Sequence, residues 1–435
     1  MTDLANHIRV TPLADTHEHL YSEAQYVENG PDVLQDLFDR LYITADLVVA
    51  GAAPAAVERL LDSSDPDIEG RWAGVAAAWE HCQHTAFGEA VRLTARRAYG
   101  MDEITGPALR AAGARNLALR QPGERLRILR DEANLAYVQV NHRTWSTLPD
   151  ASGPEFFLYD MSWYLLSNGE MEFEALRRET GIEVTNLARL REALAALFSA
   201  YAVYAVAVKS QHAYRRTLLW AERSDADAAR VLDKMLRSQP FTEAERICLG
   251  DWCLARGVEL SIEHHLPFKL HTGYNARYGE MWVDRIRPGN LCGLLQRYPQ
   301  ARFVLMHIGY PYSDELVAIA KHYPNVFVDM CWSWSIDPRG AVDFLRRALH
   351  AVPVNKLFVF GGDTFWPNAA ASFAIQARSW LTRTLQAEVD EGLLTEAEAI
   401  RLATRLMLTN QAECFAIEDK RAAIRAAVSQ SSDKP

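Results

Sequence analysis

Residues 302–330 read RFVLMHIGYPYSDELVAIAKHYPNVFVDM, and this stretch contains three predicted elements in turn. Arg302–His307 and Asn325–Met330 are short apolar runs rich in β-branched or aromatic residues, which predicts two strands. Ser313–His322 lies between them and has a helical pattern that opens with Ser-Asp, a typical helix start. Strand, helix and strand in this order indicate a parallel sheet covered by helices.

The same alternation extends over most of the chain. Six further runs of this kind bring the predicted strands to eight, the number in a (β/α)₈ TIM barrel. They are Leu13–Thr16, Leu135–Val140, Glu155–Tyr159, Ala202–Val208, Phe268–Thr272 and Lys356–Phe360. We therefore expect an α/β fold built on a closed parallel barrel.

A long segment between the first two predicted strands does not fit a plain barrel. Residues from about 30 to 125 are rich in Ala, Leu and Arg, so we expect a helical insertion there, which includes Pro54–Leu61 and Glu89–Ala98. After the last strand, Asn368–Glu388 and Thr395–Phe415 are predicted helices, the second with a capping-box pattern. We expect one barrel domain over residues 1–415 and a C-terminal helix and tail over 416–435.

Composition excludes several classes of protein. Of the 435 residues, 49% are hydrophobic and 23% are charged, as in ordinary globular domains. The net charge of −10 argues against non-specific nucleic-acid binding, which needs a basic surface. The longest uncharged apolar-rich run, residues 193–208, is short for a membrane span. There is no signal-peptide pattern and no CxxC pair, so we expect a cytoplasmic protein with no membrane or nucleic-acid partner.

The first predicted strand runs into a pair of histidines. Residues 14–19 read ADTHEH, and alternate residues of a strand face the same side, so His17 and His19 should converge. Two imidazoles at the carboxyl end of a strand are half of a metal site. An isolated HxH pattern is weak evidence, because two such residues also fall together by chance.

Four other strands end in residues of the same chemical kind. Lys209, His271, His307 and Asp363 each lie at the carboxyl end of a predicted strand, where barrel active sites are built. Each of them alone has an ordinary explanation, such as a hydrogen-bonded core histidine or a solvated loop lysine. Together they need many coincidences in one register, so the pattern favours a metal centre.

This pattern resembles the amidohydrolase superfamily, in which strands one, four, five, six and eight carry these ligand types. The segments that carry the resemblance are KSQHAYRR (209–216), LHTGY (270–274), HIGYPYSDELVAIAKHYPNVFVDM (307–330) and FVFGGDTFW (358–366). They look like the amidohydrolase-related (amidohydrolase-2) group, are most similar to nodulin- and FluG-type amidohydrolase domains, and are more distantly similar to uronate isomerases. The resemblance covers residues 10–20 and 200–415.

The resemblance implies a metal-dependent hydrolase of amide, lactone or related C–N or C–O bonds. His17, His19 and Asp363 would bind a first metal, and His271 and His307 would bind a second metal or position the substrate. Asp363 would also move the proton of the attacking water. Histidine-rich ligation without cysteine suits Zn²⁺ first and tolerates Mn²⁺. Lys209 would bridge two metals if carboxylated; otherwise it is a neutral amine or a cationic substrate anchor, because an ammonium has no lone pair.

The candidate substrate-binding residues are two arginines and three aromatic residues. Arg143 and Arg215 follow predicted strands and could bind a substrate carboxylate, although either could equally pair with acidic loop residues. Tyr274 and Tyr310 each follow a ligand histidine by three residues and could donate to a developing oxyanion. Trp332 follows the seventh strand and could pack against a ring of the substrate or simply fill the core.

Two rival functions stay open. A mononuclear enzyme similar to uronate isomerase or a decarboxylase would act on a carboxylic acid without a carboxylated lysine. A non-catalytic binding module would keep the fold and its histidines but lack turnover. By analogy with barrels of this group, we expect a homodimer.

Overall fold

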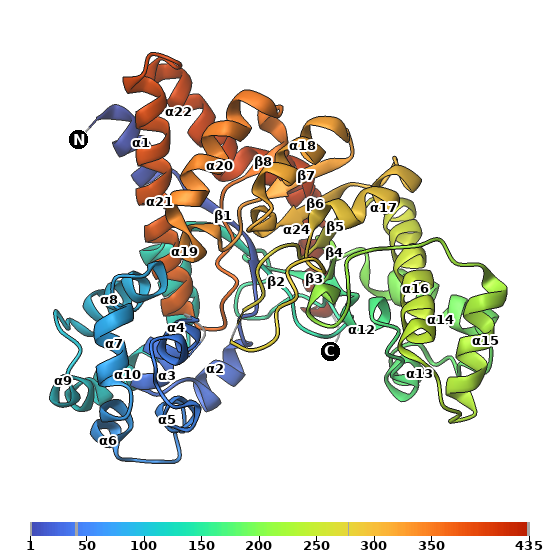
Figure 1. The fold of residues 1–435 in the computed structure, drawn as a ribbon, viewed down its shortest axis with the longest axis horizontal. Coiled ribbons are helices and arrows are strands. Elements are labelled where there is room, and N and C mark those ends of the chain that lie inside the picture. The colour runs from blue at the N-terminus through green and yellow to red at the C-terminus, as the bar shows by residue number, and fades with distance from the viewer. Residues whose placement is uncertain (1, 40–41, 277, 433–435) are drawn as a thin grey trace.

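Eight parallel strands form one sheet in the computed structural model, which describes residues 2–39, 42–276 and 278–432. Their order in the sheet is their order in the chain, and the strands lie at the centre of the molecule (Figure 1). The strands are β1 (Leu13–Glu18), β2 (Leu135–Val140), β3 (Phe157–Ser162), β4 (Ala207–Ser210), β5 (Phe268–Leu270), β6 (Phe303–Met306), β7 (Val326–Asp329) and β8 (Leu357–Phe358).

The sheet is closed by backbone hydrogen bonds between β1 and the segment that follows β8. The amide of Thr16 donates to the carbonyl of Phe360 (3.1 Å), and the amide of Asp363 donates to the carbonyl of His17 (2.8 Å). In addition, the amide of His19 donates to the carbonyl of Thr364 (2.7 Å). The predicted TIM-barrel-like fold is therefore confirmed, and its closure places Asp363 beside the two histidines of β1.

All eight predicted strands exist, but some of their ends differ. The fourth was predicted over Ala202–Val208, whereas β4 begins at Ala207 because helix α14 (Leu187–Tyr201) and the turn after it take up the first residues. The third begins at Phe157 rather than Glu155, which lies in a turn. An apolar run alone does not reveal where a turn ends and a strand starts.

Side chains from most strands fill the amino-terminal end of the barrel. Ala14, Tyr137, Leu158, Val304 and Phe358 belong to one buried cluster although they come from five different strands. Residues from the C-terminal region close this end, among them Phe415, in the turn after α23 (Asn410–Cys414), and Ile417, the first residue of α24 (Ile417–Ser432). The opposite end, at the carboxyl termini of the strands, carries the polar residues.

Helices occupy the segment between β1 and β2, as predicted, and form the blue and teal lobe beside the barrel in Figure 1. They are α2 (Glu23–Asn29), α3 (Val33–Phe38), α4 (Ile43–Val49), α5 (Pro54–Leu60), α6 (Ile68–Ala73), α7 (Ala76–Cys82), α8 (Ala86–Tyr99), α9 (Gly106–Ala111), α10 (Gly113–Leu119), α11 (Glu124–Leu126) and the π-helix η1 (Arg127–Glu132). The lobe packs on the barrel through α8, which contacts α21 and α19.

Further helices precede β1 and connect the later strands. Before and between the strands these are α1 (Asp3–Val10), α12 (Tyr164–Ser167), α13 (Phe173–Thr180), α14, η2 (His212–Tyr214), α15 (Asp225–Leu236), α16 (Glu243–Glu263), η3 (Pro288–Leu291), α17 (Cys292–Arg297), η4 (His307–Gly309), α18 (Ser313–His322), α19 (Ser333–Ile336), α20 (Pro338–Ala351) and η5 (Val354–Lys356). The predicted helix Ser313–His322 is confirmed as α18, although its N-cap residue is Tyr312.

The chain ends in a group of closing helices, α21 (Pro367–Asp390), α22 (Glu396–Thr404), the π-helix η6 (Arg405–Thr409), α23 (Asn410–Cys414) and α24 (Ile417–Ser432). The capping box predicted before α22 is present, because Thr395 and Glu398 bond to each other's backbone amides. The division into residues 1–415 and 416–435 stays a prediction. Over the described residues, no helix has the length and hydropathy that a membrane span requires.

Candidate metal centre

The residues predicted as ligands converge at the carboxyl end of the barrel. His17 lies in β1, and His19, His271, His307 and Asp363 follow β1, β5, β6 and β8. Among the described residues, two ligand sets have their donor atoms within 4.8 Å of one another: His17, His19 and Asp363, and His271, His307 and Asp363. Asp363 is common to both sets and lies between them.

The distances in the first set fit a metal ion. Oδ1 of Asp363 lies 3.4 Å from Nε2 of His17 and 3.3 Å from Nε2 of His19. Ligands at about 2.0–2.1 Å from a tetrahedral zinc ion are separated by about 3.3–3.4 Å. Both distances from Asp363 therefore match the spacing of ligands on a tetrahedral ion, and the donor atoms of the two histidines lie within 4.8 Å of each other.

Hydrogen bonds to carbonyl groups set the tautomers of two histidines. Nδ1 of His19 donates to the carbonyl of Asn141 (2.6 Å), so its Nε2 carries the lone pair that faces Asp363. Nδ1 of His307 donates to the carbonyl of Cys331 (3.0 Å), and its buried Nε2 has no hydrogen-bond partner in the described part of the chain. Lone pairs that face a carboxylate repel it unless a cation lies between them, so the donor set fits a metal.

His271 is directed to the second ligand set through Nδ1, whereas the other histidines use Nε2. Its Nε2 donates to the carbonyl of Tyr274 (3.0 Å), which leaves the lone pair on Nδ1. The rings of His271 and His307 lie 4.3 Å apart, and Nε2 of His307 is 3.8 Å from Oδ2 of Asp363. The second oxygen of Asp363 is thus directed to the second pair of histidines.

Burial sets the protonation states that metal binding needs. It lowers the pKa of His17 and His271 well below the usual value and lowers the pKa of His307 to about 4, so these rings are neutral at pH 7. Burial acts to raise the pKa of Asp363, but the polar contact with His19 and the neighbouring His307 and Lys209 bring that pKa below its usual range. The site therefore combines neutral imidazoles with an ionised carboxylate.

Lys209 lies inside the ring of candidate ligands. Its Nζ is 3.2 Å from Nε2 of His17, and burial lowers the pKa of its amine to about 8. Lys269 is its register partner on β5 and forms a buried ion pair with Asp160 of β3, at 2.8 Å. Lys269 and Asp160 were not among the predicted site residues. Lys269 lies two residues before His271, and this spacing alone indicates that both face inward.

The three aromatic candidates form a wall beside the second histidine pair. The ring of Tyr274 lies 6.1 Å from Tyr310 and 5.9 Å from Trp332, and Trp332 lies 5.8 Å from His307. The three aromatic residues predicted from the sequence are therefore neighbours in the structure. Trp334, two residues on, is a core residue whose indole donates to the carbonyl of Val359.

The helical insertion adds two aromatic residues that sequence reasoning missed. The hydroxyl of Tyr42 donates to the backbone carbonyl of Asp363, and its ring lies 4.5 Å from Trp332. Phe87 of α8 stacks on the other part of Trp332 at 5.9 Å. The insertion therefore contacts the candidate metal centre directly, although nothing in the local sequence marks these residues.

The two candidate arginines contact the same tyrosine, Tyr164. Nε of Arg215 donates to the hydroxyl of Tyr164 (3.1 Å), and the guanidinium of Arg143 lies 5.5 Å from the same ring. Both arginines are exposed, and within the described residues neither has a carboxylate within 4.0 Å. Arg216, the next residue, instead forms a fully buried ion pair with Asp251 at 2.8 Å.

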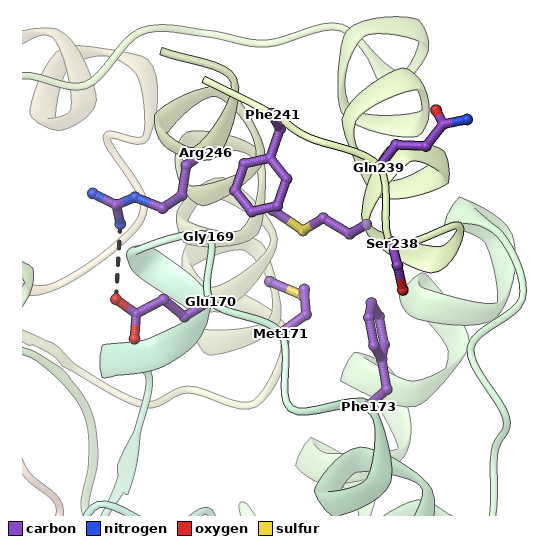
Figure 2. A pocket seen from close by; sticks show the side chains of 9 residues that line it. Gly169, Glu170, Met171, Phe173, Ser238, Gln239, Phe241 and Arg246 are labelled. Carbon is purple, nitrogen blue, oxygen red and sulfur yellow. Dashed lines mark ion pairs between the residues drawn. The ribbon is translucent and has the colours of Figure 1, made fainter. Parts of the chain in front are cut away.

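A separate pocket of about 360 Å³ lies outside the barrel, between the segment after α12 and the ends of α15 and α16 (Figure 2). Met171, Phe173 and Phe241 line it, and Glu170 pairs with Arg246 at its edge at 3.9 Å. Arg246 also donates to Glu243 and to the carbonyl of Asn168. The cations and anions of this pocket are paired within the protein, and it contains no candidate ligand.

A closed parallel barrel with HxH on β1, histidines after β5 and β6 and an aspartate after β8 defines an enzyme of the amidohydrolase superfamily. The Amidohydrolase family model (Amidohydro_2) matches residues 181–400, about half of the chain, and the chain belongs to this family.

Two curated relatives have different lengths. The chain is 27% identical to protein fluG of Emericella nidulans over 226 residues, which are 49% of the chain and only 26% of fluG. It is 25% identical to a uronate isomerase of Xanthomonas campestris over 371 residues, 76% of the chain and 74% of that enzyme. The chain thus spans about a quarter of the first relative and most of the second.

Solved structures share the fold over nearly the whole chain. A uronate isomerase from Thermotoga maritima superposes with a TM-score of 0.79 at 17% identity, covering 95% of this chain and 96% of that one. A candidate metal-dependent hydrolase from Lactobacillus casei gives a TM-score of 0.67 at 17% identity, with coverage of 97% and 99%. Both matches include the helical segment between β1 and β2.

Proposed function

We propose that this enzyme is a metal-dependent hydrolase that cleaves an amide, lactone or related C–N or C–O bond of a small carboxylate-bearing substrate. The observation that carries the proposal is the tetrahedral spacing of Asp363 Oδ1 from His17 (3.4 Å) and His19 (3.3 Å). Zn²⁺ is the proposed ion and Mn²⁺ the second choice, because the ligands are imidazole and carboxylate. An ion of this kind lowers the pKa of water to about 7 and polarises a carbonyl group.

Asp363 is the proposed acid–base residue. One of its oxygens faces His17 and His19, and the other faces His307, so the carboxylate borders the space between the two ligand sets. It accepts a proton from the attacking water as the new C–O bond forms. It then returns this proton to the leaving nitrogen or oxygen as the old bond breaks. Its ionised state at neutral pH suits the first of these steps.

The surroundings of the centre suggest how the substrate is oriented. Arg143 and Arg215, grouped at Tyr164, are proposed to bind the carboxylate of the substrate, since both guanidinium groups lack an acidic partner in the described structure. Tyr274 and Tyr310 lie next to each other near His271 and His307, and a hydroxyl of either is proposed to donate to the oxygen that gains charge. Trp332 is 2% exposed and its ring packs against Tyr42, Phe87 and Tyr274, so it fills the core beside the tyrosines, the other of the two roles expected for it.

A second candidate function is a mononuclear isomerase or decarboxylase that acts on a uronate or another carboxylic acid. It is favoured by the uronate isomerase of Xanthomonas campestris, which aligns over 76% of the chain. In this alternative Lys209 stays an amine and contacts the substrate. A cytoplasmic location and a homodimer remain proposals, as does the absence of nucleic-acid and membrane partners.

The experiment is a turnover screen with the Zn²⁺- or Mn²⁺-loaded enzyme and its His19→Asn variant. The panel contains N-acyl amino acids, lactones of hydroxy acids and free uronates, and products are identified by NMR and mass. Hydrolysis adds one water to the mass of the substrate, whereas isomerisation leaves the mass unchanged and decarboxylation removes CO₂. Hydrolysis that the variant lacks supports the proposal. Isomerisation or decarboxylation alone overturns it in favour of the second candidate.

A further inference from the structure

We infer that Glu18, which has not been assigned a role above, is a positioning residue for Asp363. Together with Asp15 it holds the backbone on both sides of Asp363, so that this carboxylate meets His17 and His19 at metal-binding distance. The inference rests on the proposed metal centre but not on the substrate or the reaction class, so it is tested with metal alone.

Asp363 has a backbone conformation that needs support. Its φ is 59°, in the left-handed region that side chains other than glycine seldom adopt. Its amide donates to the carbonyl of His17 (2.8 Å), and its carbonyl accepts the hydroxyl of Tyr42. These bonds hold the residue itself, and the two acidic side chains of β1 hold its neighbours.

Glu18 binds the residue after Asp363. One of its oxygens, Oε2, accepts both the amide (2.5 Å) and the hydroxyl (2.9 Å) of Thr364. Asp15 binds the residue before, because its Oδ1 accepts the amide of Gly362 (3.3 Å) while it also accepts the amide of His17 (3.1 Å). The same strand thus supplies two metal-ligand histidines and two acceptors that bracket the third ligand.

Gly362 is the residue that permits this close approach. A Cβ atom at position 362 would lie 1.9 Å from Oε1 of Glu18, a distance that real Cβ atoms do not show. A glycine before Asp363 therefore allows the Glu18 side chain to reach Thr364. The segment 361–364 therefore fits the side chain of Glu18, which lies between the two histidines in the sequence.

The carboxyl group of Glu18 is fully buried and forms no ion pair with a lysine, arginine or histidine among the described residues. Besides Thr364, its side chain bonds to the carboxyl group of Asp15, the other acid of β1. A buried carboxyl group without a cation is unfavourable for stability, and an apolar residue of similar size would avoid that cost. Its two bonds to Thr364 are instead directed at the chain that carries Asp363.

The test compares the binding of Co²⁺ by the whole protein and four variants. Glu18→Met removes the acceptor, whereas Glu18→Gln keeps an oxygen for Thr364. Thr364→Val removes the hydroxyl donor, whereas Thr364→Ser keeps it. The readouts are the dissociation constant, from competition with a chelator, and the visible absorption spectrum of bound Co²⁺, which reports the coordination geometry. Thermal unfolding of the metal-free proteins shows that each variant is folded.

We expect Glu18→Met to weaken Co²⁺ binding about 10- to 100-fold and to change the spectrum, since residues that orient metal ligands have effects of this size. Thr364→Val should weaken binding less, and Glu18→Gln and Thr364→Ser should restore most of the wild-type affinity and spectrum. If Glu18→Met does not fold, the Thr364 pair decides alone. Wild-type affinity and spectrum in Glu18→Met and Thr364→Val overturn this inference but leave the metal centre standing. A wild-type protein that binds no Co²⁺ overturns both.

Discussion

The amine of Lys209 lies 3.2 Å from Nε2 of His17, inside the ring of candidate metal ligands. Lys209 also neighbours Lys269 on the next strand, and Lys269 is neutralised by Asp160. Of these two lysines, Lys209 is therefore the one that contacts a candidate metal ligand.

Replacing Lys209 by Met should leave the metal held by His17, His19 and Asp363 in place but lower kcat by at least about 100-fold, the size of a lost acid–base or positioning group. The measurement is metal content together with steady-state kinetics on the substrate found in the turnover screen. Unchanged kcat would remove Lys209 from the proposed machinery.

Arg215 and Arg216 are adjacent in sequence but should have opposite effects. Arg215→Met removes an exposed guanidinium, so KM should rise at least about tenfold for a charged hydrogen bond lost to the substrate, with an unchanged melting temperature. Arg216→Met breaks the buried ion pair with Asp251 and should destabilise the protein by about 3 kcal/mol. This is the lower end of the range for breaking such pairs, because Arg223 still forms an ion pair with Asp251. Kinetics and thermal unfolding of both variants check this, and a KM effect confined to Arg216→Met contradicts it.

The buried histidines should contribute less to the stability of the metal-free protein in acid. The pKa of His307 is lowered by burial to about 4, whereas an unfolded histidine has a pKa of about 6.5. The unfolded state therefore binds more protons between these values, so stability is complete above pH 6.5 and is lost as pH falls towards 4. His17 and His271 act in the same direction.

Urea unfolding at pH 8 and pH 5 measures this effect. The buried carboxyl groups of Asp15, Glu18 and Asp329 have raised pKa values and act in the opposite direction, so the comparison is between variants. The free energy of unfolding at pH 5 relative to pH 8 should be higher in His307→Asn than in the wild type. His81→Asn, which changes an exposed histidine of α7, is the matched control and should behave as the wild type. The same pH dependence in His307→Asn and the wild type would mean that His307 is not held neutral by burial.

Tyr274 is the better placed of the two tyrosines to stabilise developing charge, because its carbonyl binds His271 and its ring lies between Tyr310 and Trp332. Tyr274→Phe should lower kcat about 100- to 1,000-fold, as loss of an oxyanion donor does, with little change in KM or metal content. The exposed Tyr278→Phe serves as the control. A full kcat in Tyr274→Phe would assign this role to another donor.

Much of the barrel and its ligands could be predicted from sequence because the signal is local. Each strand is a short apolar run, and most of the ligands lie at the end of a strand or directly after it, so one pattern marks both. His307 shows this clearly: it comes immediately after β6, and its partner His271 comes immediately after β5.

The remainder depends on contacts between segments far apart in the chain. Tyr42 reaches Asp363 across 321 positions of sequence, and Glu18 reaches Thr364 across 346. No periodicity near Tyr42 or Glu18 marks such a contact. The start of β4 was misjudged for a related reason, since helix packing rather than the apolar run decides where Ala202–Val206 turns.

The most direct test of the metal centre is the metal content of the purified protein and of its His17→Asn/His19→Asn double variant, measured by inductively coupled plasma mass spectrometry. We predict at least one equivalent of zinc or manganese per wild-type chain, and no stoichiometric metal in a double variant that keeps the wild-type circular dichroism spectrum. A second equivalent in the wild type would indicate a carboxylated Lys209. Full metal content in the double variant, or none in the wild type after reconstitution, would contradict the account.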